Sequence, residues 1–366
     1  MPGEFDPAEE LGLGPRRYLL LEPRGFLLNG DINREICSEL IPGGDRLYDV
    51  IERYDYISGF VRDPEGPYGS SARYMIPFLK VYGATERSMF ETAKKKMRFT
   101  RGAKDSCAYL SELMNVIIRT GMYDQALTHF LNVMGSPGAN ICGTDSAIDP
   151  FNLDRIDSEK IKEIAGKLSS LEVSSYEYPR NTSDLIPEDT ELFRKTRRAL
   201  ERDMPLQGAV LFEGCKAINS LDKAWVYADK KVRDQDGTVY IGSNASDSKV
   251  MGFVNSDSGM TISFNGTDAA VRACRIAVVS DDSLAGTFFA QMFNSYGYQH
   301  TLETAEDWSR SYLDACEISD RRIIDRILSR TGAFPKVFVV DRNNVEDVVE
   351  KNRNACKKIK AGRSGY

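Results

Sequence analysis

Apolar residues recur every three or four positions through the first half of the chain, which is the period of an amphipathic helix. In 31–40 they are Ile32, Ile36 and Leu40, which fall on one face. The same period predicts helices over 45–57, 70–97, 105–120, 122–134 and 158–171. Pro77 and Gly83 interrupt the range 70–97, so we expect a kink or a break there. Residues 31–171 are therefore predicted to form a helical domain.

The period changes from 3.6 to 2 in the second half of the chain. Alternating or short apolar runs predict strands over 209–212, 224–232, 238–241, 250–254 and 260–264. The dipeptide Asp236-Gly237 is a strong hairpin signal. Because Met260, Ile262 and Phe264 alternate with polar residues, we expect one face of these strands to be in water and the pairing to be antiparallel.

These patterns predict a mixed α+β fold, in which an N-terminal helical domain is followed by a β-hairpin-containing α/β domain. Residues 1–30, interrupted by proline and glycine, are expected to form an N-terminal arm with possible edge strands at 18–21 and 25–28. Residues 172–189 are polar and contain two prolines, which is typical of an interdomain linker. The second domain then spans 190–366 and ends in a basic C-terminal tail.

One segment, 273–299, combines a buried strand, an acidic turn and an amphipathic helix. A second buried strand at 336–340 ends in Asp341 and is followed by a predicted helix over 345–358. If the two strands were adjacent and parallel, Asp281, Asp282 and Asp341 would converge and could hold Mg²⁺. Alternatively, these carboxylates cap the helices that follow them, which requires no other residue and is the preferred interpretation.

Composition narrows the possible classes of protein. The 366 residues are 42% hydrophobic and 28% charged, with a net charge of −6, which is ordinary for a globular protein and does not favour coating of nucleic acid by bulk charge. The seven cysteines include no C-x-x-C pair and indicate a reducing compartment, so a cytoplasmic protein is expected, or a virion component if the source is viral. No apolar run has the length of a membrane span.

Basic residues gather in two short stretches despite the acidic total. With one interleaved aromatic residue, such stretches suit a phosphate backbone and a stacked base, although lysines at a helix C-terminus are also favoured by the helix dipole. The candidate nucleic-acid-binding residues are Lys94, Lys95, Lys96, Arg98, Phe99, Arg101, Lys104, Arg194, Lys195, Arg197 and Arg198.

Two classes of function fit these observations. No GxGxxG motif follows a strand, and the Walker loop and GxSxG are absent, so no cofactor and no catalytic residue is predicted. The favoured hypothesis is a non-enzymatic, self-assembling protein, such as a viral nucleoprotein or capsid-type subunit, that binds single-stranded RNA or DNA through the basic stretches. The alternative is a Mg²⁺-dependent α/β enzyme acting on a phosphate ester, with Asp281, Asp282 and Asp341 as metal ligands.

Overall fold

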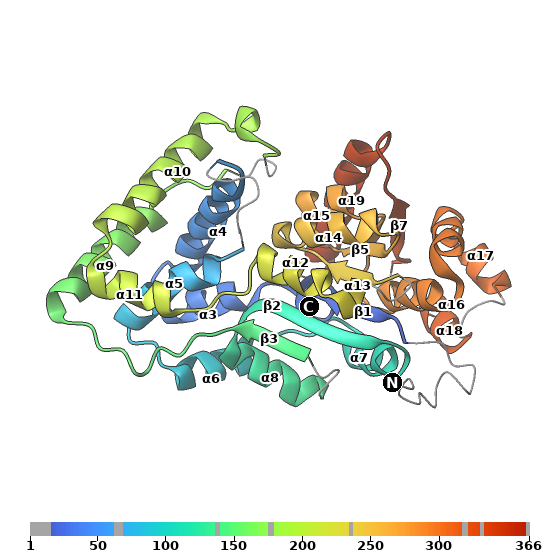
Figure 1. Cartoon of the computed structure of the whole chain (residues 1–366), viewed down its shortest axis with the longest axis horizontal. Helices are drawn as coiled ribbons and strands as arrows, with labels where there is room; N and C mark the ends of the chain where they lie inside the picture. The colour runs from blue at the N-terminus through green and yellow to red at the C-terminus, as the bar shows by residue number, and fades with distance from the viewer. Residues whose placement is uncertain are drawn as a thin grey trace, which may run out of the picture.

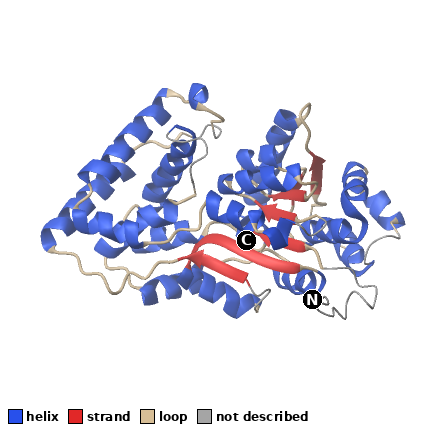
Figure 2. Ribbon diagram, viewed as in Figure 1, coloured by secondary structure: helices blue, strands red, loops and turns tan. Residues whose placement is uncertain are grey.

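The short apolar runs of the chain form one sheet at the centre of the molecule (Figures 1 and 2). The structure is a computed structural model that describes residues 16–61, 69–135, 140–174, 179–233, 237–316, 321–329 and 333–363. Within these ranges the sheet has seven strands in the order β3-β2-β1-β4-β5-β6-β7. All neighbouring pairs are parallel except β6 and β7. The strands are β1 (Tyr18–Leu21), β2 (Asn115–Tyr123), β3 (Asn140–Thr144), β4 (Val239–Gly242), β5 (Met260–Phe264), β6 (Ile276–Val279) and β7 (Lys336–Val339).

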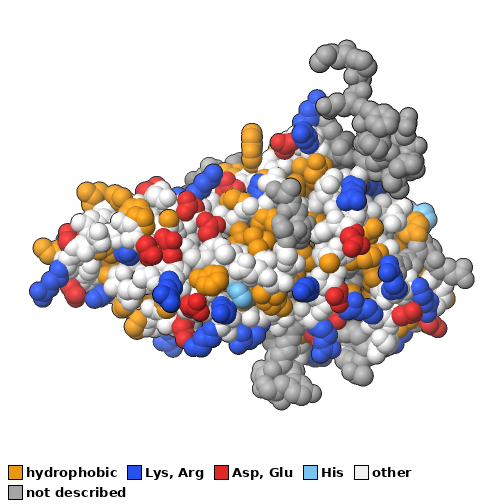
Figure 3. Space-filling model, turned by 90° about the horizontal axis from the view of Figure 1, so that it is seen from below, with side chains coloured by type: hydrophobic (Ala, Val, Ile, Leu, Met, Phe, Trp, Pro, Cys, Tyr) orange, Lys and Arg blue, Asp and Glu red, His pale blue; other side chains and the backbone are white. Residues whose placement is uncertain are grey.

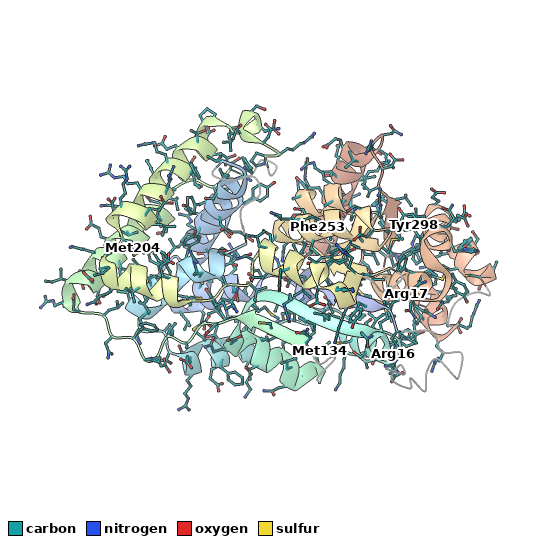
Figure 4. All side chains as sticks on the ribbon, viewed as in Figure 1. Arg16, Arg17, Met134, Met204, Phe253 and Tyr298 are labelled. Atoms are coloured by element: carbon teal, nitrogen blue, oxygen red, sulfur yellow. The ribbon has the colours of Figure 1, made fainter. Side chains whose placement is uncertain are left out.

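Helices cover both faces of this sheet, and β1 shows the consequence, because Leu19, Leu20 and Leu21 are all buried. Leu19 and Leu21 of β1 enter one hydrophobic core, and Leu20 between them enters the other. A pleated strand points successive side chains to opposite faces. Because neither face of β1 meets water, all three of these residues are apolar. Met134 of α8 and Phe253 of α14 lie on opposite sides of the sheet (Figure 4).

The helices that flank the sheet come from most of the chain. They are α2 (Pro23–Phe26), α6 (Glu86–Lys96), α7 (Ala103–Leu113), α8 (Asp124–Met134), α12 (Ser220–Ala228), α13 (Lys230–Arg233), η3 (Ala245–Asp247), α14 (Ser248–Ser256), α15 (Asp268–Ala273), α16 (Leu284–Glu306), α17 (Arg310–Ala315), α18 (Arg321–Leu328) and α19 (Val345–Arg363). Among the described residues, no helix has both the length and the apolar character needed to cross a bilayer.

A second group of helices stands beside the sheet, at the left of Figure 1. Its members are α3 (Ile32–Leu40), α4 (Gly44–Val61), α5 (Ser71–Val81), α9 (Arg155–Ser169), η1 (Thr182–Asp184), α10 (Pro187–Arg198), η2 (Ala199–Asp203) and α11 (Leu206–Gly214). The first three lie between β1 and β2 in the sequence, and the others lie between β3 and β4. The group is thus built from two insertions into the sheet, which meet where α4 packs against α9 and α10.

One buried ion pair joins the two insertions. Arg53 of α4 donates from Nε and Nη2 to the two carboxylate oxygens of Asp189 on α10, at 2.8 and 2.6 Å. Both side chains are at most 5% exposed. Two parallel charge-assisted hydrogen bonds fix the relative orientation of the two helices.

The mixed helix and strand class predicted from the sequence is confirmed, but several elements were wrongly predicted. The predicted strands at 209–212, 224–232 and 250–254 are helices, so the hairpin predicted at Asp236-Gly237 lacks its first strand. The predicted antiparallel pairing is also wrong, because β4 pairs with β5 in parallel. All five residues of β5 are buried, so its polar residues do not face water. The predicted helix at 105–120 ends at Leu113 and gives way to β2.

The structure describes only parts of the N-terminal arm and of the interdomain linker predicted from the sequence. Tyr18–Leu21 is not an edge strand, because β1 pairs with β2 on one side and β4 on the other. Residues 1–15 of the arm, 175–178 of the linker and Asp236 of the predicted turn lie outside the described residues. Strands from both sides of 172–189 share one sheet. Division of the chain in that linker stays a prediction.

The Arg53–Asp189 pair gives a stability prediction. Asp189→Ala should lower the free energy of unfolding by about 3–5 kcal/mol, because the buried guanidinium would lose the carboxylate that balances its charge. Urea denaturation measures the loss. Glu191→Ala is the matched control on the same helix, because the pair of Glu191 with Lys195 is exposed and should contribute nothing measurable. Equal stability of the two variants would contradict the structural role of the buried pair.

Candidate active site

A carboxylate stands at the end of β1, an interior strand of the sheet. Glu22 follows β1 directly and is buried. Its oxygen Oε1 accepts hydrogen bonds from the Thr120 hydroxyl of β2, at 2.8 Å, and from the Arg24 backbone N–H, at 3.4 Å. Gly25, with φ of 82°, completes the turn, and a Cβ there would lie 2.5 Å from the Phe264 carbonyl oxygen. The turn that presents Glu22 therefore requires glycine.

A buried lysine connects this carboxylate to a second one. Lys223 Nζ donates to Glu22 Oε2 at 2.8 Å, to Asp247 Oδ1 at 2.6 Å and to Ser246 Oγ at 3.2 Å. Lys223 lies in the first turn of α12, where Asn219 and Asp222 form a capping box. All three donors of the ammonium group are thus used.

The backbone after β4 holds Asp247 in place. Its Oδ2 accepts from the N–H groups of Ser243 and Asn244, each at 2.8 Å, and its Oδ1 accepts from the Tyr240 hydroxyl at 2.8 Å. A Cβ at Gly242 would lie 2.5 Å from Oδ2, so only glycine allows the carboxylate to approach the strand end this closely.

Burial and charge act in opposite directions on these groups. Burial raises the pKa of Glu22 above its ordinary value, although Lys223 acts to lower it. Burial alone would lower the pKa of Lys223, but Asp247 and Glu22 outweigh it and raise that pKa. Lys223 therefore stays protonated, while Glu22 holds a proton more readily than an exposed glutamate does.

The Glu22 carboxylate faces a pocket between the sheet and the second helix group. The cavity has a volume of about 80 Å³ and is lined from β2, α3, α4 and the segment after β4. The pocket lies at the carboxyl end of β1. Strands β2 and β3 extend the sheet on one side of β1, and β4 begins its extension on the other side, so the strand order reverses at this point. Ligands of open α/β sheets bind at this position.

The far wall of the pocket is rich in carboxyl groups. Arg24 Nη1 donates to Asp31 Oδ2 at 2.7 Å and to Glu52 Oε1 at 3.1 Å. Asp55 Oδ2 accepts from the backbone N–H groups of Gly69 and Ser70, at 2.6 and 2.7 Å. Burial raises the pKa of Asp55 to about 7, despite the lowering effect of these two hydrogen bonds.

The structure does not form the metal site suggested by the sequence. Because β7 runs antiparallel to β6, Asp341 lies at the opposite end of the sheet from Asp281 and Asp282. Asp282 Oδ1 accepts from the Leu284 N–H at the start of α16, and Asp341 Oδ1 accepts from Asn343 and Asn344 before α19. Among the described residues, no three His, Cys, Asp or Glu side chains are placed to hold a metal ion.

The first basic stretch, at the end of α6 and beyond, is largely engaged with its surroundings. Lys95 and Lys96 both pair with Glu39, at 2.6 and 3.0 Å. Arg98 donates to two nearby carbonyl groups. Phe99 stacks on Phe130, with ring centroids 6.2 Å apart, so it is not presented as an open stacking surface. Lys94 and Lys104 are exposed, and Arg101 forms a backbone bridge with Asp282.

The second basic stretch is on α10, apart from the first (Figure 1). Lys195 pairs with Glu191, Arg197 with Glu201 and Arg198 with Asp203. Arg194 is the remaining candidate of this stretch. On the face seen in Figure 3, basic and acidic side chains are interspersed and do not form a stripe of one sign. A role for either stretch in binding RNA or DNA stays a prediction.

The sequence analysis missed the pocket residues. Glu22 and Asp247 each follow a short apolar run, which was a usable signal. Lys223 and Asp55 gave no comparable signal, because each comes from a helix and reaches the pocket only through the tertiary fold.

Comparison with known proteins yields structural matches only. No family model and no curated protein matches the sequence. A solved structure of gene product AF1437 from Archaeoglobus fulgidus matches with a TM-score of 0.72 and 18% identity, over 93% of this chain and 96% of that one. A phospho-aspartyl intermediate analogue of phosphoserine phosphatase (TM-score 0.43, 14% identity) covers 72% of this chain and 92% of its own. A substrate-bound phosphoserine phosphatase complex matches with a TM-score of 0.44 and 13% identity, over 73% of this chain and 95% of that one.

These findings correct the favoured function. The prediction of a non-enzymatic viral nucleoprotein or capsid-type subunit is wrong, because over 93% of its length the chain has the fold of the archaeal gene product. The physical reason for the error is that the basic stretches were weighed without their carboxylate partners: Glu39, which the fold brings to Lys95 and Lys96, and Glu191, one helical turn from Lys195. Self-association of the chain stays a prediction.

Asp55 gives a prediction about stability and pH. Its carboxyl ionises at about 7 in the folded chain and near the ordinary value of 3.8 when unfolded. Between these values the folded state binds the extra proton, so stability should fall as pH rises, by up to roughly 1.4 kcal/mol per unit. Asp55→Asn keeps an oxygen for the two N–H groups and should remove this part of the pH dependence.

Chemical denaturation at several pH values between 4 and 8 tests this expectation over the range set by the two pKa values. Glu350→Gln, at an exposed position of α19, is the control and should keep the wild-type slope. An unchanged slope in Asp55→Asn would show that another group carries the effect.

Proposed function

We propose that this chain hydrolyses a phosphate ester in the pocket beside Glu22. The observation that supports the proposal is the buried arrangement of Glu22, Lys223 and Asp247 at the carboxyl end of the central strands, which faces a cavity. Buried charged groups with shifted pKa values in a pocket are typical of active sites, because stability alone does not favour them.

Two fixed cations border the space where the phosphate would lie. Lys223 is on the side of the sheet, and Arg24 is on the side of α3 and α4. A guanidinium group can donate hydrogen bonds to phosphate oxygens. The Lys223 ammonium, whose three donors are used within the protein, acts on the phosphate through its charge. They also neutralise the charge that develops as the ester bond breaks.

Glu22 is the nucleophile in this proposal. A carboxylate has about four lone-pair sites, and the contacts of Glu22 with Thr120, Lys223 and the Arg24 N–H leave one for attack. An oxygen of Glu22 attacks phosphorus, the ester P–O bond breaks, and its electron pair leaves with the alcohol oxygen. Water then attacks phosphorus in the acyl phosphate, which releases inorganic phosphate and restores the carboxylate.

Asp55 supplies and recovers the proton. It lines the same pocket, and its pKa of about 7 lets it exist in both forms near neutral pH. The protonated carboxyl gives its proton to the leaving alcohol oxygen, and the resulting carboxylate accepts a proton from the attacking water. Such general acid–base steps typically contribute about 10²–10⁴-fold in rate.

Removal of the nucleophile tests the proposal most directly. Glu22→Gln keeps the shape and the hydrogen-bonding oxygen but cannot form an acyl phosphate, so release of phosphate from a panel of phosphate esters should fall at least about 10³-fold. Asp341→Asn is the control for loss of a carboxylate after a strand and should retain full activity. Failure of the wild type to release phosphate from any ester would reject the proposal.

The pH profile tests the two carboxyl groups separately. The value of kcat/KM should follow a bell, falling at low pH as Glu22 takes up a proton and above pH 7 as Asp55 loses one. Asp55→Asn should lower the rate and remove the alkaline limb. Asp124→Asn is the matched control, because burial also raises the pKa of Asp124, to about 6, but this residue lies outside the pocket lining.

A further inference from the structure

Two buried carboxylates at neighbouring strand ends are the usual start of a divalent cation site. Glu22 follows β1 and Asp247 follows β4, which are adjacent and parallel. In phosphate-handling sites Mg²⁺ is typically held by one or two such carboxylates together with phosphate oxygens. If the pocket held a metal ion, the position between Glu22 and Asp247 would therefore be the first candidate for it.

An ammonium group already occupies that position. Lys223 Nζ lies 2.8 Å from Glu22 Oε2 and 2.6 Å from Asp247 Oδ1. A Mg²⁺ ion needs oxygen ligands at about 2.0–2.1 Å in an octahedron, so it could not share this space with the ammonium. Asp247 is also committed to Tyr240 and to two backbone N–H groups, so the acceptor position that Lys223 occupies is the one a metal would need.

The other carboxylates of the pocket offer no second place. Asp31 and Glu52 converge on Arg24, and Asp55 accepts two backbone hydrogen bonds. Each of these carboxylates is thus already bound to a guanidinium group or to backbone N–H groups through at least one oxygen. This agrees with the lack of any three-ligand cluster in the part of the chain that the structure describes.

We propose that Lys223 takes the place of a divalent metal ion, so that the pocket binds and hydrolyses its phosphate ester without one. The inference rests on the proposed function. Lys223 then has two roles: it keeps Glu22 oriented, and its charge faces the phosphate. Protons balance the remaining negative charge of the pocket carboxyl groups. This agrees with Glu52 and Asp55, because burial is the main cause that raises the pKa of each.

The wild-type protein gives the first test. After treatment with a chelator, binding of inorganic phosphate is measured by calorimetry with and without millimolar Mg²⁺, and release of phosphate from an ester is followed under both conditions. Affinity and rate should agree within about twofold, and Mg²⁺ should leave Tm unchanged, because an ion without a site does not stabilise the fold.

The outcomes separate this inference from the proposed function. Phosphate binding and hydrolysis that both require Mg²⁺ would overturn the inference and leave the hydrolase proposal standing. No binding and no hydrolysis under either condition would overturn both. Metal-free binding and hydrolysis support both.

A variant gives the second test. Lys223→Ala removes the ammonium and leaves two facing carboxylates, so Mg²⁺ or Mn²⁺ should raise the Tm of this variant but not that of the wild type. Lys230→Ala, at an exposed lysine on the following helix, is the control and should show no response. A folded Lys223→Ala protein whose Tm ignores both metals would contradict the idea that the ammonium fills a cation position. If this variant does not fold, the wild-type measurements decide.

Discussion

The contact of one buried ammonium group with two carboxylates holds together the part of the molecule where strands and helices meet. Glu22 comes from β1, Asp247 from the segment after β4, and Lys223 from α12, which the sequence separates by up to 225 residues. Because all three side chains are at most 3% exposed, none can find water as a substitute partner. Loss of Lys223 would leave two buried carboxylates without their shared counterion, and loss of either carboxylate would leave the ammonium with one. The register of β1 against β4 is thereby tied to the placement of α12.

The second wall of the pocket depends on a different kind of constraint. Asp31, Glu52 and Asp55 all come from the insertion after β1, and the insertion after β3 packs against it where α9 and α10 contact α4. The Arg53–Asp189 pair fixes α4 against α10, and Arg24 connects the turn after β1 to α3 and α4. The pocket is thus a product of tertiary packing, with each of its sides held by an ion pair.

This construction explains what the sequence could and could not predict. Strands β5, β6 and β7 were recognisable because their apolar runs are short and rich in β-branched residues. Helices α12 and α14 were mistaken for strands, because a helix that packs on a sheet with few exposed polar positions loses a clear period. The parallel order of β1 and β4 joins segments more than 200 residues apart, and no local pattern encodes it. For the same reason the site residues, chosen from local motifs, did not include Lys223 or Asp55.

Energetics connect the architecture to the proposed chemistry. Transfer of an ammonium and two carboxylates out of water is unfavourable by several kcal/mol per ion, and apolar side chains of similar volume would often give an equally stable core. The chain nevertheless places these charges near the carboxyl ends of β1 and β4, beside a cavity, and not in the middle of either hydrophobic core. Fixed charges in a site of low dielectric need no reorganisation when a charged substrate reacts, and there they act more strongly than in water. An arrangement that stability does not require, at the position where open α/β sheets bind ligands, is therefore best explained by the chemistry of a bound anion.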